Sequence, residues 1–437
     1  MLPSILSPGN WPEAERKRLE QLESRTWSPL EAQTVEGSGG MVSATVSPIA
    51  VYAAIQALKL GGNAADAAAT AALTQVTTQL GSVVSYAGIF AMLYYDAKTR
   101  KVHSMDAAYN SYLQETDPKS IPVCGSGLSL GQQLLRRFAR KPVAGGASGR
   151  QTLVPGFMAG VEAMHGRFGC LPFRDLFEPA VWYAEHGVRI SHLLQYCLLF
   201  RSKFLSRTPE GQRFLRQVVK EKLKADRGVW QLAMGFLLQM MGKPKAGDLF
   251  VQPDLAKTLK AVSEQGSRYM YTGQWGEDFV SIVQREGGKV TLEDLKRYEP
   301  VWSEPRRETV FGHTVYVNGP PHRGAYSLFA GLNLAEAMKL DQKSAYWMDP
   351  ETFRALARIG LFVFGAPWLH RGASNFLSGK GIDISPEAQL GKDYAQAVAP
   401  LLEQLYAQAA DNAPKHSNAI VVIDKDGIPA RTSLYCS

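Results

Sequence analysis

Apolar residues recur at helical spacing shortly after residue 47, and the residues at both ends of this stretch are ones that start and stop helices. Ser47 and Pro48 supply an N-cap and a first-turn proline. Gly61 and Gly62 then interrupt the pattern. We therefore expect a helix that runs from Pro48 to Leu60.

A second helix is expected directly after this break. Asn63 is a good N-cap, and Asp66 lies in the first turn, where a carboxylate favours the exposed amides and the helix dipole. The segment AADAAATAALTQV is small and apolar around nearly its whole girth. A helix of this kind is buried between other layers, so the sequence predicts a core with two sides.

Strand patterns lie at both ends of the chain. Phe90–Asp96 and Lys101–Asp106 are apolar, aromatic-rich runs around the turn AKTR, which indicates a β-hairpin. Met41–Ser47 alternates β-branched and small residues, and Ala419–Ile423 is β-branched and followed by a turn sequence. We expect these terminal segments to meet in one sheet system.

The region between the strands reads mainly as helix, from Pro155 to about Leu402. Amphipathic segments occur at 157–168, 173–186, 255–265 and 279–286. Strands at both ends with helices between them predict the α+β class, as a single domain with a large helical wing.

The charge and hydropathy of the sequence limit the classes of partner that we expect the protein to bind. The 48 Lys and Arg residues exceed the 40 Asp and Glu residues by 8, but the charges are scattered. A short basic run at 136–141 contains one aromatic residue, Phe138, which favours a solvated helix end over a nucleic-acid patch. No apolar run is long enough for a signal peptide or a membrane span, so we expect a cytoplasmic protein that binds neither nucleic acid nor membrane.

The sequence offers no pattern for a cofactor. The four cysteines are widely spaced, without a CxxC pair, so neither a metal site nor a disulfide framework is indicated. A phosphate-cradling glycine motif is also missing from the sequence. We expect no metal and no other cofactor.

One long segment carries a specific resemblance. LKLGGNAADAAATAAL resembles the large-subunit signature of gamma-glutamyltranspeptidases, and the similarity continues through YYDAKTRKVHSMDA and LVPGFMAGVEAMHGRFGCLPFRDLFEPAVWYAEHGVRIS. It covers most of the chain from Met41 onward. Residues 1–40 form an N-terminal extension without a recognisable counterpart, and about 197–245 resembles a helical insertion.

The resemblance implies a fold and a division of the chain. Members of this family are N-terminal nucleophile hydrolases with an αββα sandwich, made as precursors that cut themselves. Residues 41–416 would form the large subunit, and 417–437 the start of a small subunit that is incomplete at the C-terminus. The matching small-subunit start is SNAIVVIDKDG, so the resemblance implies cleavage between His416 and Ser417.

Cleavage would create the catalytic group. A hydroxyl is a weak nucleophile at neutral pH, and the freed α-amine of Ser417 would serve as its base. Ser in place of the family's Thr keeps the oxygen but loses the methyl group that restricts χ1. The expected activity is amide hydrolysis or acyl transfer through an acyl-enzyme. We interpret His416 as part of the cleavage junction only.

The substrate pocket departs from the family pattern. The Arg that would bind the carboxylate of a γ-glutamyl group such as glutathione is replaced by Ala108, and Asn110 offers only neutral hydrogen bonds. Tyr435 stands where the family has a second Thr beside the nucleophile. Arg323, in the loop GPPHRGAY, could replace the missing cation or be an ordinary exposed loop residue. A non-standard amide substrate is therefore expected.

Two alternatives follow from the 20 residues that remain after Ser417. The chain is either an active hydrolase or transferase, with the rest of the small subunit supplied by a separate chain or simply absent from this sequence, or a truncated and inactive relative that acts as an interaction or regulatory protein. The family's oxyanion-hole donors lie in the later part of the small subunit, and such donors contribute strongly to the rate.

Overall fold

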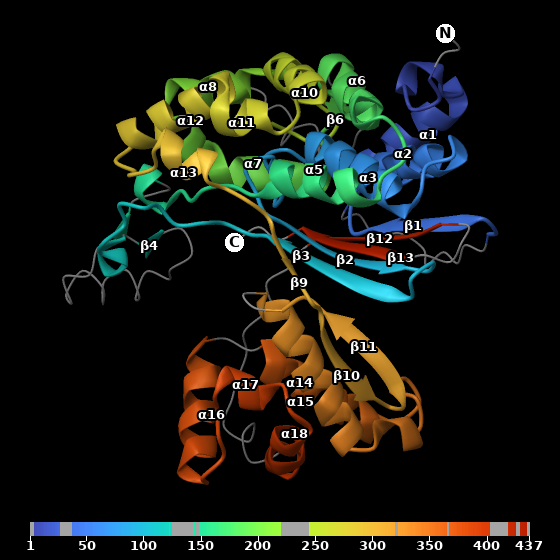
Figure 1. Ribbon diagram of the computed structural model, residues 1–437, viewed down its shortest axis with the longest axis vertical. Helices are drawn as coiled ribbons and strands as arrows, with labels where there is room; N and C mark the ends of the chain where they lie inside the picture. The colour runs from blue at the N-terminus through green and yellow to red at the C-terminus, as the bar shows by residue number, and fades with distance from the viewer. Residues whose placement is uncertain are drawn as a thin grey trace, which may run out of the picture. The chain divides into compact units, whose positions relative to one another are not determined.

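The computed structural model describes residues 4–26, 37–121, 123–124, 143–144, 148–219, 244–319, 322–364, 367–402, 418–424 and 429–434 (Figure 1). It forms two compact units. The first comprises Met1–Lys101, Met105–Trp302 and Ser417–Ser437, and the second Val102–Ser104 and Ser303–His416. Each unit is described by itself.

The first unit contains one main sheet and several short strands. This sheet has the order β1-β12-β13-β2-β3-β9, where β3 and β9 extend into the second unit. Its strands are β1 (Gly40–Ala44), β2 (Phe90–Asp96), β3 (Lys101–Ala107), β9 (Val301–Ser303), β12 (Asn418–Asp424) and β13 (Pro429–Leu434). The short strands are β4 (Val123–Cys124), β5 (Val143–Ala144), β6 (Val188–Arg189), β7 (Val218–Val219) and β8 (Leu249–Phe250).

Helices make up most of the rest of the first unit. Its α-helices are α1 (Glu13–Ser24), α2 (Pro48–Lys59), α3 (Ala64–Thr78), α5 (Phe157–Phe168), α6 (Glu178–His186), α7 (His192–Leu205), α8 (Pro209–Arg216), α10 (Pro253–Gln265), α11 (Arg268–Thr272), α12 (Gln274–Arg285) and α13 (Leu292–Lys296). Short 3-10 turns are η1 (Pro8–Asn10), η2 (Pro118–Ser120), η4 (Gly149–Gln151) and η5 (Phe173–Phe177).

The main sheet joins the two ends of the chain, as the sequence predicted. Strand β1 pairs antiparallel with β12, β12 with β13, and β13 with β2. The hairpin expected around AKTR is also confirmed as β2 and β3, and its turn uses Arg100 at a positive φ of 56°. The C-terminal strands therefore lie inside the sheet, next to the N-terminal one.

The expected helix caps are present. The Ser47 hydroxyl accepts a 3.2 Å hydrogen bond from the Ala50 amide at the start of α2. At α3, Asn63 Oδ1 accepts from the Ala65 and Asp66 amides, and the Asp66 carboxylate accepts from the Asn63 amide at 2.9 Å. This reciprocal pairing is a capping box, which satisfies donors that would otherwise be exposed at the helix end.

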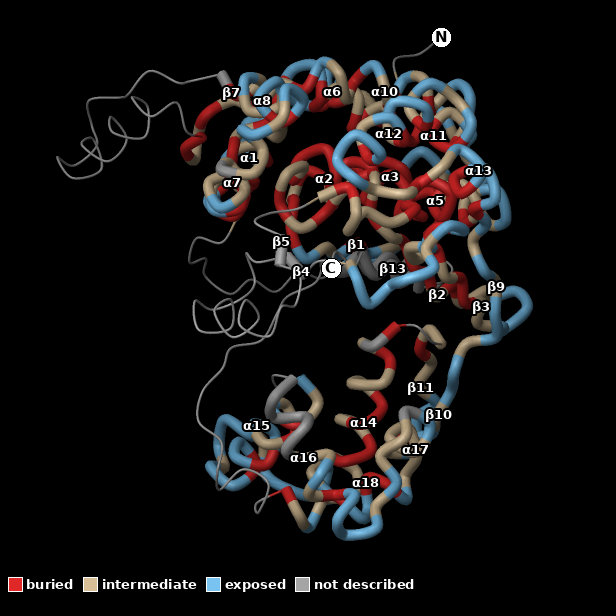
Figure 2. The backbone as a smooth tube through the Cα atoms, turned by 90° about the vertical axis from the view of Figure 1, so that its left-hand side faces the viewer, coloured by how far each residue is buried: buried red, intermediate tan, exposed pale blue. Residues whose placement is uncertain are grey.

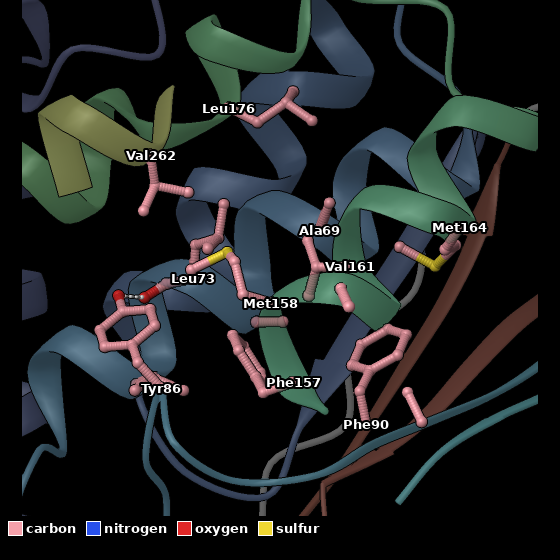
Figure 3. Packing of buried hydrophobic residues seen from close by; sticks show 14 of the residues in the cluster. Ala69, Leu73, Tyr86, Phe90, Phe157, Met158, Val161, Met164, Leu176 and Val262 are labelled. Carbon is pink, nitrogen blue, oxygen red and sulfur yellow. Dashed lines mark hydrogen bonds between the residues drawn. The ribbon is translucent and has the colours of Figure 1, made fainter. Parts of the chain in front are cut away.

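Helices α2, α3 and α5 cover one face of the main sheet (Figure 1). All 15 residues of α3 are buried (Figure 2), as its small apolar surface predicted. In the core next to it, Phe157 and Val161 of α5 pack with Leu73 of α3 and with Phe90 at the start of β2 (Figure 3). In this unit the described residues form one large sheet with a helical layer, and a second large sheet is not among them.

The N-terminal extension belongs to this core. Leu6, Trp11 and Leu19 are at most 5% exposed. The ring of Trp11 packs edge-on against Tyr52 of α2, with the ring centroids 4.7 Å apart. Trp11 and Leu19, which have no counterpart in the resemblance, therefore contribute to the same apolar cluster as residues of α2 and α6, and Leu6 contributes to the cluster around α3.

The expected insertion at 197–245 is described in part. It begins within α7, continues through α8, and reaches β7, which pairs antiparallel with β8. Residues 220–243 lie outside the described residues.

The second unit is a hairpin with helices. Strands β10 (Arg306–Val310) and β11 (His313–Val317) pair antiparallel. The helices are α14 (Arg323–Ala337), α15 (Pro350–Phe364), α16 (Pro367–Gly379), α17 (Pro386–Gln389) and α18 (Lys392–Val398), with 3-10 turns η6 (Leu340–Gln342) and η7 (Ala399–Leu401). Leu334, Ile359 and Val398 belong to its own core cluster.

The helices of both units differ from membrane spans. Among the described residues, no helix combines the length and the apolar character that crossing a bilayer requires.

Candidate active site

The strand register brings several chain segments to one end of the main sheet. Ala44 near the end of β1 pairs with Ile420 near the start of β12, and Asn418 pairs with Leu434 at the end of β13. Ser433 pairs in turn with Ala91 at the start of β2. Because β3 returns from β2 in a hairpin, its carboxyl end lies at this same end of the sheet.

Three of the predicted site residues border this end in sequence, but their own positions are not described. Ser417 precedes β12 by one residue, with His416 before it, and Tyr435 follows β13 by one residue. All three lie outside the described residues. The strands β12 and β13 that border them in sequence are described.

Ala108 and Asn110 follow β3 and are described. The Asp106 carboxylate accepts a 2.8 Å hydrogen bond from the Ala108 amide, which turns the chain as β3 ends. Asn110 then forms a small antiparallel bridge with Val154, through its amide at 3.2 Å and its carbonyl at 2.9 Å. The Asn110 side chain is not needed for this bridge, and the residue is exposed.

Two tyrosines that the sequence did not single out hold this segment. The Tyr298 hydroxyl donates a 2.6 Å hydrogen bond to the Ala108 carbonyl, and the Tyr271 hydroxyl donates one of 2.8 Å to the Pro155 carbonyl. Their rings stack with the centroids 5.5 Å apart. Burial raises the pKa of both hydroxyls, and the neighbouring Asp106 adds to the rise at Tyr298, so both remain protonated donors.

A glycine allows this close packing. A Cβ on Gly156 would lie 1.9 Å from the Tyr298 hydroxyl and 2.2 Å from the Ala107 carbonyl oxygen. Real Cβ atoms do not approach other atoms so closely. Position 156 therefore accepts only glycine while Tyr298 keeps its bond to Ala108.

The loop before β2 is connected to the same region. The Gly88 carbonyl accepts hydrogen bonds of 3.0 Å from the Gly156 and Phe157 amides at the start of α5. The Tyr86 hydroxyl lies 2.6 Å from the Leu73 carbonyl oxygen, to which it donates (Figure 3). Hydrogen bonds thus hold this loop, GSVVSYAGIF, against α3 and the start of α5.

Arg323, the possible replacement for the missing cation, and its neighbour His322 lie in the second unit. His322 is 7% exposed and precedes α14, which Arg323 begins. The Arg323 side chain is outside what the structure describes.

The described site consists of backbone groups, hydroxyls and one carboxylate, without a candidate metal centre. Within the described parts of the chain, no group of three or more His, Cys, Asp and Glu residues could hold a metal ion. Cys170 and Cys197 are free thiols there.

Comparison with curated proteins gives several relatives. The chain is 28% identical over 395 residues to the glutathione hydrolase proenzyme of Pseudomonas aeruginosa, which covers 89% of this chain and 62% of that protein. It is 25% identical over 279 residues to the capsule biosynthesis protein CapD proenzyme of Bacillus anthracis, covering 63% and 44%. The glutathione hydrolase proenzyme of Bacillus subtilis is matched over 46% of its length. The chain thus spans about three fifths of the first of these relatives and less than half of the other two.

Solved structures share the fold. The gamma-glutamyltranspeptidase from Pseudomonas nitroreducens, complexed with L-DON, matches with a TM-score of 0.59 at 22% identity, over 88% of this chain and 97% of that one. Cephalosporin acylase from Bacillus halodurans matches with a TM-score of 0.62 at 18% identity, over 94% and 68%. The α+β fold is therefore that of the N-terminal nucleophile hydrolases, as the sequence predicted.

A family profile settles the assignment. The profile described as gamma-glutamyltranspeptidase matches residues 50–427, which is most of the 437-residue chain. On this ground the chain belongs to the gamma-glutamyltranspeptidase family.

Proposed function

We propose that the chain is a self-cleaving amide hydrolase or acyltransferase whose nucleophile is Ser417. One observation carries this proposal: β12 begins one residue after Ser417, and its amino end lies at the same end of the sheet as the Asp106–Asn110 segment. A nucleophile at position 417 would start an interior strand. An interior strand is hydrogen-bonded on both sides, and a reacting hydroxyl at its start would be oriented for attack.

The cut itself consumes one water molecule. The Ser417 hydroxyl attacks the carbonyl carbon of His416, the C–N bond breaks, and the amide nitrogen takes up the hydroxyl proton. Water then hydrolyses the resulting ester. The products are a carboxylate at His416 and a free amine and hydroxyl at Ser417.

The freed amine then serves catalysis. It accepts the hydroxyl proton of Ser417 as the oxygen attacks a substrate amide carbonyl, and the proton passes to the leaving amine. The acyl-enzyme is released by water in hydrolysis or by an amine in transfer. The names of the relatives, glutathione hydrolase and the transpeptidase CapD, cover both outcomes.

The substrate is proposed to be an amide other than a standard γ-glutamyl compound. Ala108 carries no charge, and Tyr298 uses the Ala108 carbonyl as its acceptor. Asn110 can offer its side-chain amide as a neutral hydrogen-bond partner. A substrate whose acyl group lacks the α-carboxylate of a γ-glutamyl group fits these residues better than glutathione does.

A partner chain that completes the small subunit is part of the proposal. The relatives extend well beyond the region that this chain matches. On the sheet, Val42 packs into the helical core while its neighbour Met41 points the other way and is 51% exposed. A second sheet layer over that face would bury Met41, as large apolar side chains on inner sheet faces usually are.

Intact mass of the purified protein tests the nucleophile. We expect a large fragment that ends at His416, and Ser417→Ala should abolish it while Ser433→Ala should not. An uncut wild-type chain would overturn the proposal and favour the alternative, an inactive relative with an interaction or regulatory role.

A further inference from the structure

A buried carboxylate from the N-terminal helix lies beside the start of α2. Glu23, the penultimate residue of α1, is fully buried. Its Oε2 atom accepts a 2.8 Å hydrogen bond from the Ser47 hydroxyl, and its Oε1 atom accepts one from the Gln79 side-chain amide. Burial raises the pKa of Glu23, although the hydrogen bonds from Ser47 and Gln79 oppose this rise. Both carboxylate oxygens therefore act as acceptors in the core.

The partner of this carboxylate is conformationally unusual. Ser47 has a φ of 70°, in the left-handed region that a non-glycine residue rarely occupies. Its hydroxyl donates to Glu23 and accepts from the Thr78 hydroxyl at 2.8 Å and from the Ala50 amide at 3.2 Å. One donor and two acceptor sites are all that a hydroxyl has. Ser47 is thus fully engaged, which suits a rigid support.

This support lies where β1 leaves the sheet. Gln75 of α3 donates a 2.8 Å hydrogen bond to the Val46 carbonyl, so the chain from Val46 to Ser47 is held from two sides. The pairing of β1 with β12 is antiparallel, with Ala44 opposite Ile420. Ser47 follows Ala44, the last paired residue of β1, by three positions, and Ile420 is the third residue of β12. The network therefore adjoins the end of the strand that pairs with the amino part of β12.

We propose that Glu23 is a positioning residue that holds, through Ser47, the amino end of β12 and thereby the bond proposed to be cut. The inference rests on the proposed function for its link to the reaction. It also assigns a role to the N-terminal helix, which the family resemblance does not cover. Cleavage needs a fixed hydroxyl and a fixed carbonyl, so a looser strand start would slow it.

Two variants remove the network in different ways. Glu23→Gln keeps the shape of the side chain but replaces one acceptor oxygen by an NH2 group, which faces a donor. Ser47→Gly removes the hydroxyl, while glycine accepts the positive φ and remains an adequate N-cap. Glu13→Gln is the matched control, because Glu13 lies on the same helix and is solvent-exposed. Thermal unfolding confirms that each variant is folded.

Hydrogen–deuterium exchange tests the support directly. It is measured on the uncut Ser417→Ala chain, so that every protein has the same covalent state. Residues 418–424 should exchange about tenfold faster with Glu23→Gln or Ser47→Gly, as expected for the loss of a buried hydrogen bond to a carboxylate. The β10–β11 hairpin of the second unit and the Glu13→Gln protein should be unchanged. Equal exchange of 418–424 in all proteins would overturn the inference, whether or not the wild type cuts itself.

The cutting rate tests the link to the reaction. With Ser417 present, Glu23→Gln should cut about tenfold more slowly than wild type, because its reacting groups are less well oriented. Glu23→Asp, which restores a carboxylate, should recover part of the rate. Faster exchange together with an unchanged cutting rate would refute the positioning role. An uncut wild type would instead refute the proposed function.

Discussion

The Tyr298 hydroxyl donates a 2.6 Å hydrogen bond to the carbonyl of Ala108, a residue 190 positions earlier in the chain. Ala108 stands where the family resemblance has an Arg that binds carboxylate. The backbone at this position is therefore held firmly, although its side chain is only a methyl group. The Tyr298 hydrogen bond concerns the stability of this segment, whereas the side chain at position 108 concerns substrate binding. Each can therefore be tested by its own substitution.

Removal of the Tyr298 hydroxyl should destabilise the protein. Tyr298→Phe leaves the Ala108 carbonyl without this partner in a region that is largely buried. We expect the free energy of unfolding to fall by about 1–2 kcal/mol in urea titration. Tyr346→Phe, on a side chain that is 50% exposed, is the control and should change it by less than about 0.5 kcal/mol. A Tyr298→Phe protein as stable as wild type would show that the bond is not needed.

A cation at position 108 should change substrate choice. If the cut protein is active, Ala108→Arg should raise the release of aniline from a γ-glutamyl anilide by about tenfold, since Arg can bind the substrate carboxylate through two hydrogen bonds. The control is Ser111→Arg, which adds the same charge three residues later in an exposed position. An equal gain in both variants would mean that net charge matters and not the mapped pocket.

Replacement of Gly156 by alanine should lower the stability of the protein. Gly156→Ala forces the new Cβ against the Tyr298 hydroxyl and the Ala107 carbonyl. We expect a loss of about 2–4 kcal/mol in the free energy of unfolding, seen as a lower Tm. Gly166→Ala on α5 is the matched control, because nothing lies within 4 Å of the position that its Cβ would take. That variant should gain about 0.5–1 kcal/mol, since alanine favours a helix.

The stability contributed by the contacts of Asp66, at the start of α3, with His165 and Cys170 should depend on pH. The Asp66 carboxylate accepts hydrogen bonds from the Cys170 amide at 3.1 Å and from the Cys170 thiol at 3.0 Å, and His165 Nε2 lies 3.4 Å from it. Burial is the largest influence and favours the neutral imidazole, but the hydrogen bonds to Asp66 and to the Leu171 carbonyl, together with the charges of Asp66 and Glu162, outweigh it and raise the pKa of His165. Burial also opposes the charge on Asp66, yet hydrogen bonds from His165 and its neighbours lower the pKa of Asp66.

The sign of this dependence follows from the direction of each shift. The contribution of His165 is complete below about pH 6.5, the unfolded value, and is lost as pH rises through the raised folded pKa. The contribution of Asp66 is lost at the acid end, as pH falls through its lowered pKa. His165→Gln should therefore destabilise more at about pH 5.5 than at about pH 9 in urea titration. In an Asp66→Asn background this difference should vanish, and its persistence would assign the effect to another group.

The sequence alone determined the local elements. The caps at Ser47 and Asn63, the buried helix that follows, and the β2–β3 hairpin depend on residues within a few positions of one another, and all are present. Local hydrogen bonds and apolar spacing are sufficient for these predictions. The family motif also indicated the fold and the expectation that both ends of the chain share a sheet.

The tertiary structure decided which distant residues support the candidate site. The bonds of Tyr298 to Ala108 and of Glu23 to Gln79 join positions that are 190 and 56 residues apart. Tyrosine and glutamate at such positions look like ordinary surface residues in the sequence, because no local pattern marks their partners. Only packing brings a donor and an acceptor together away from water, and that burial is what makes each of these bonds matter.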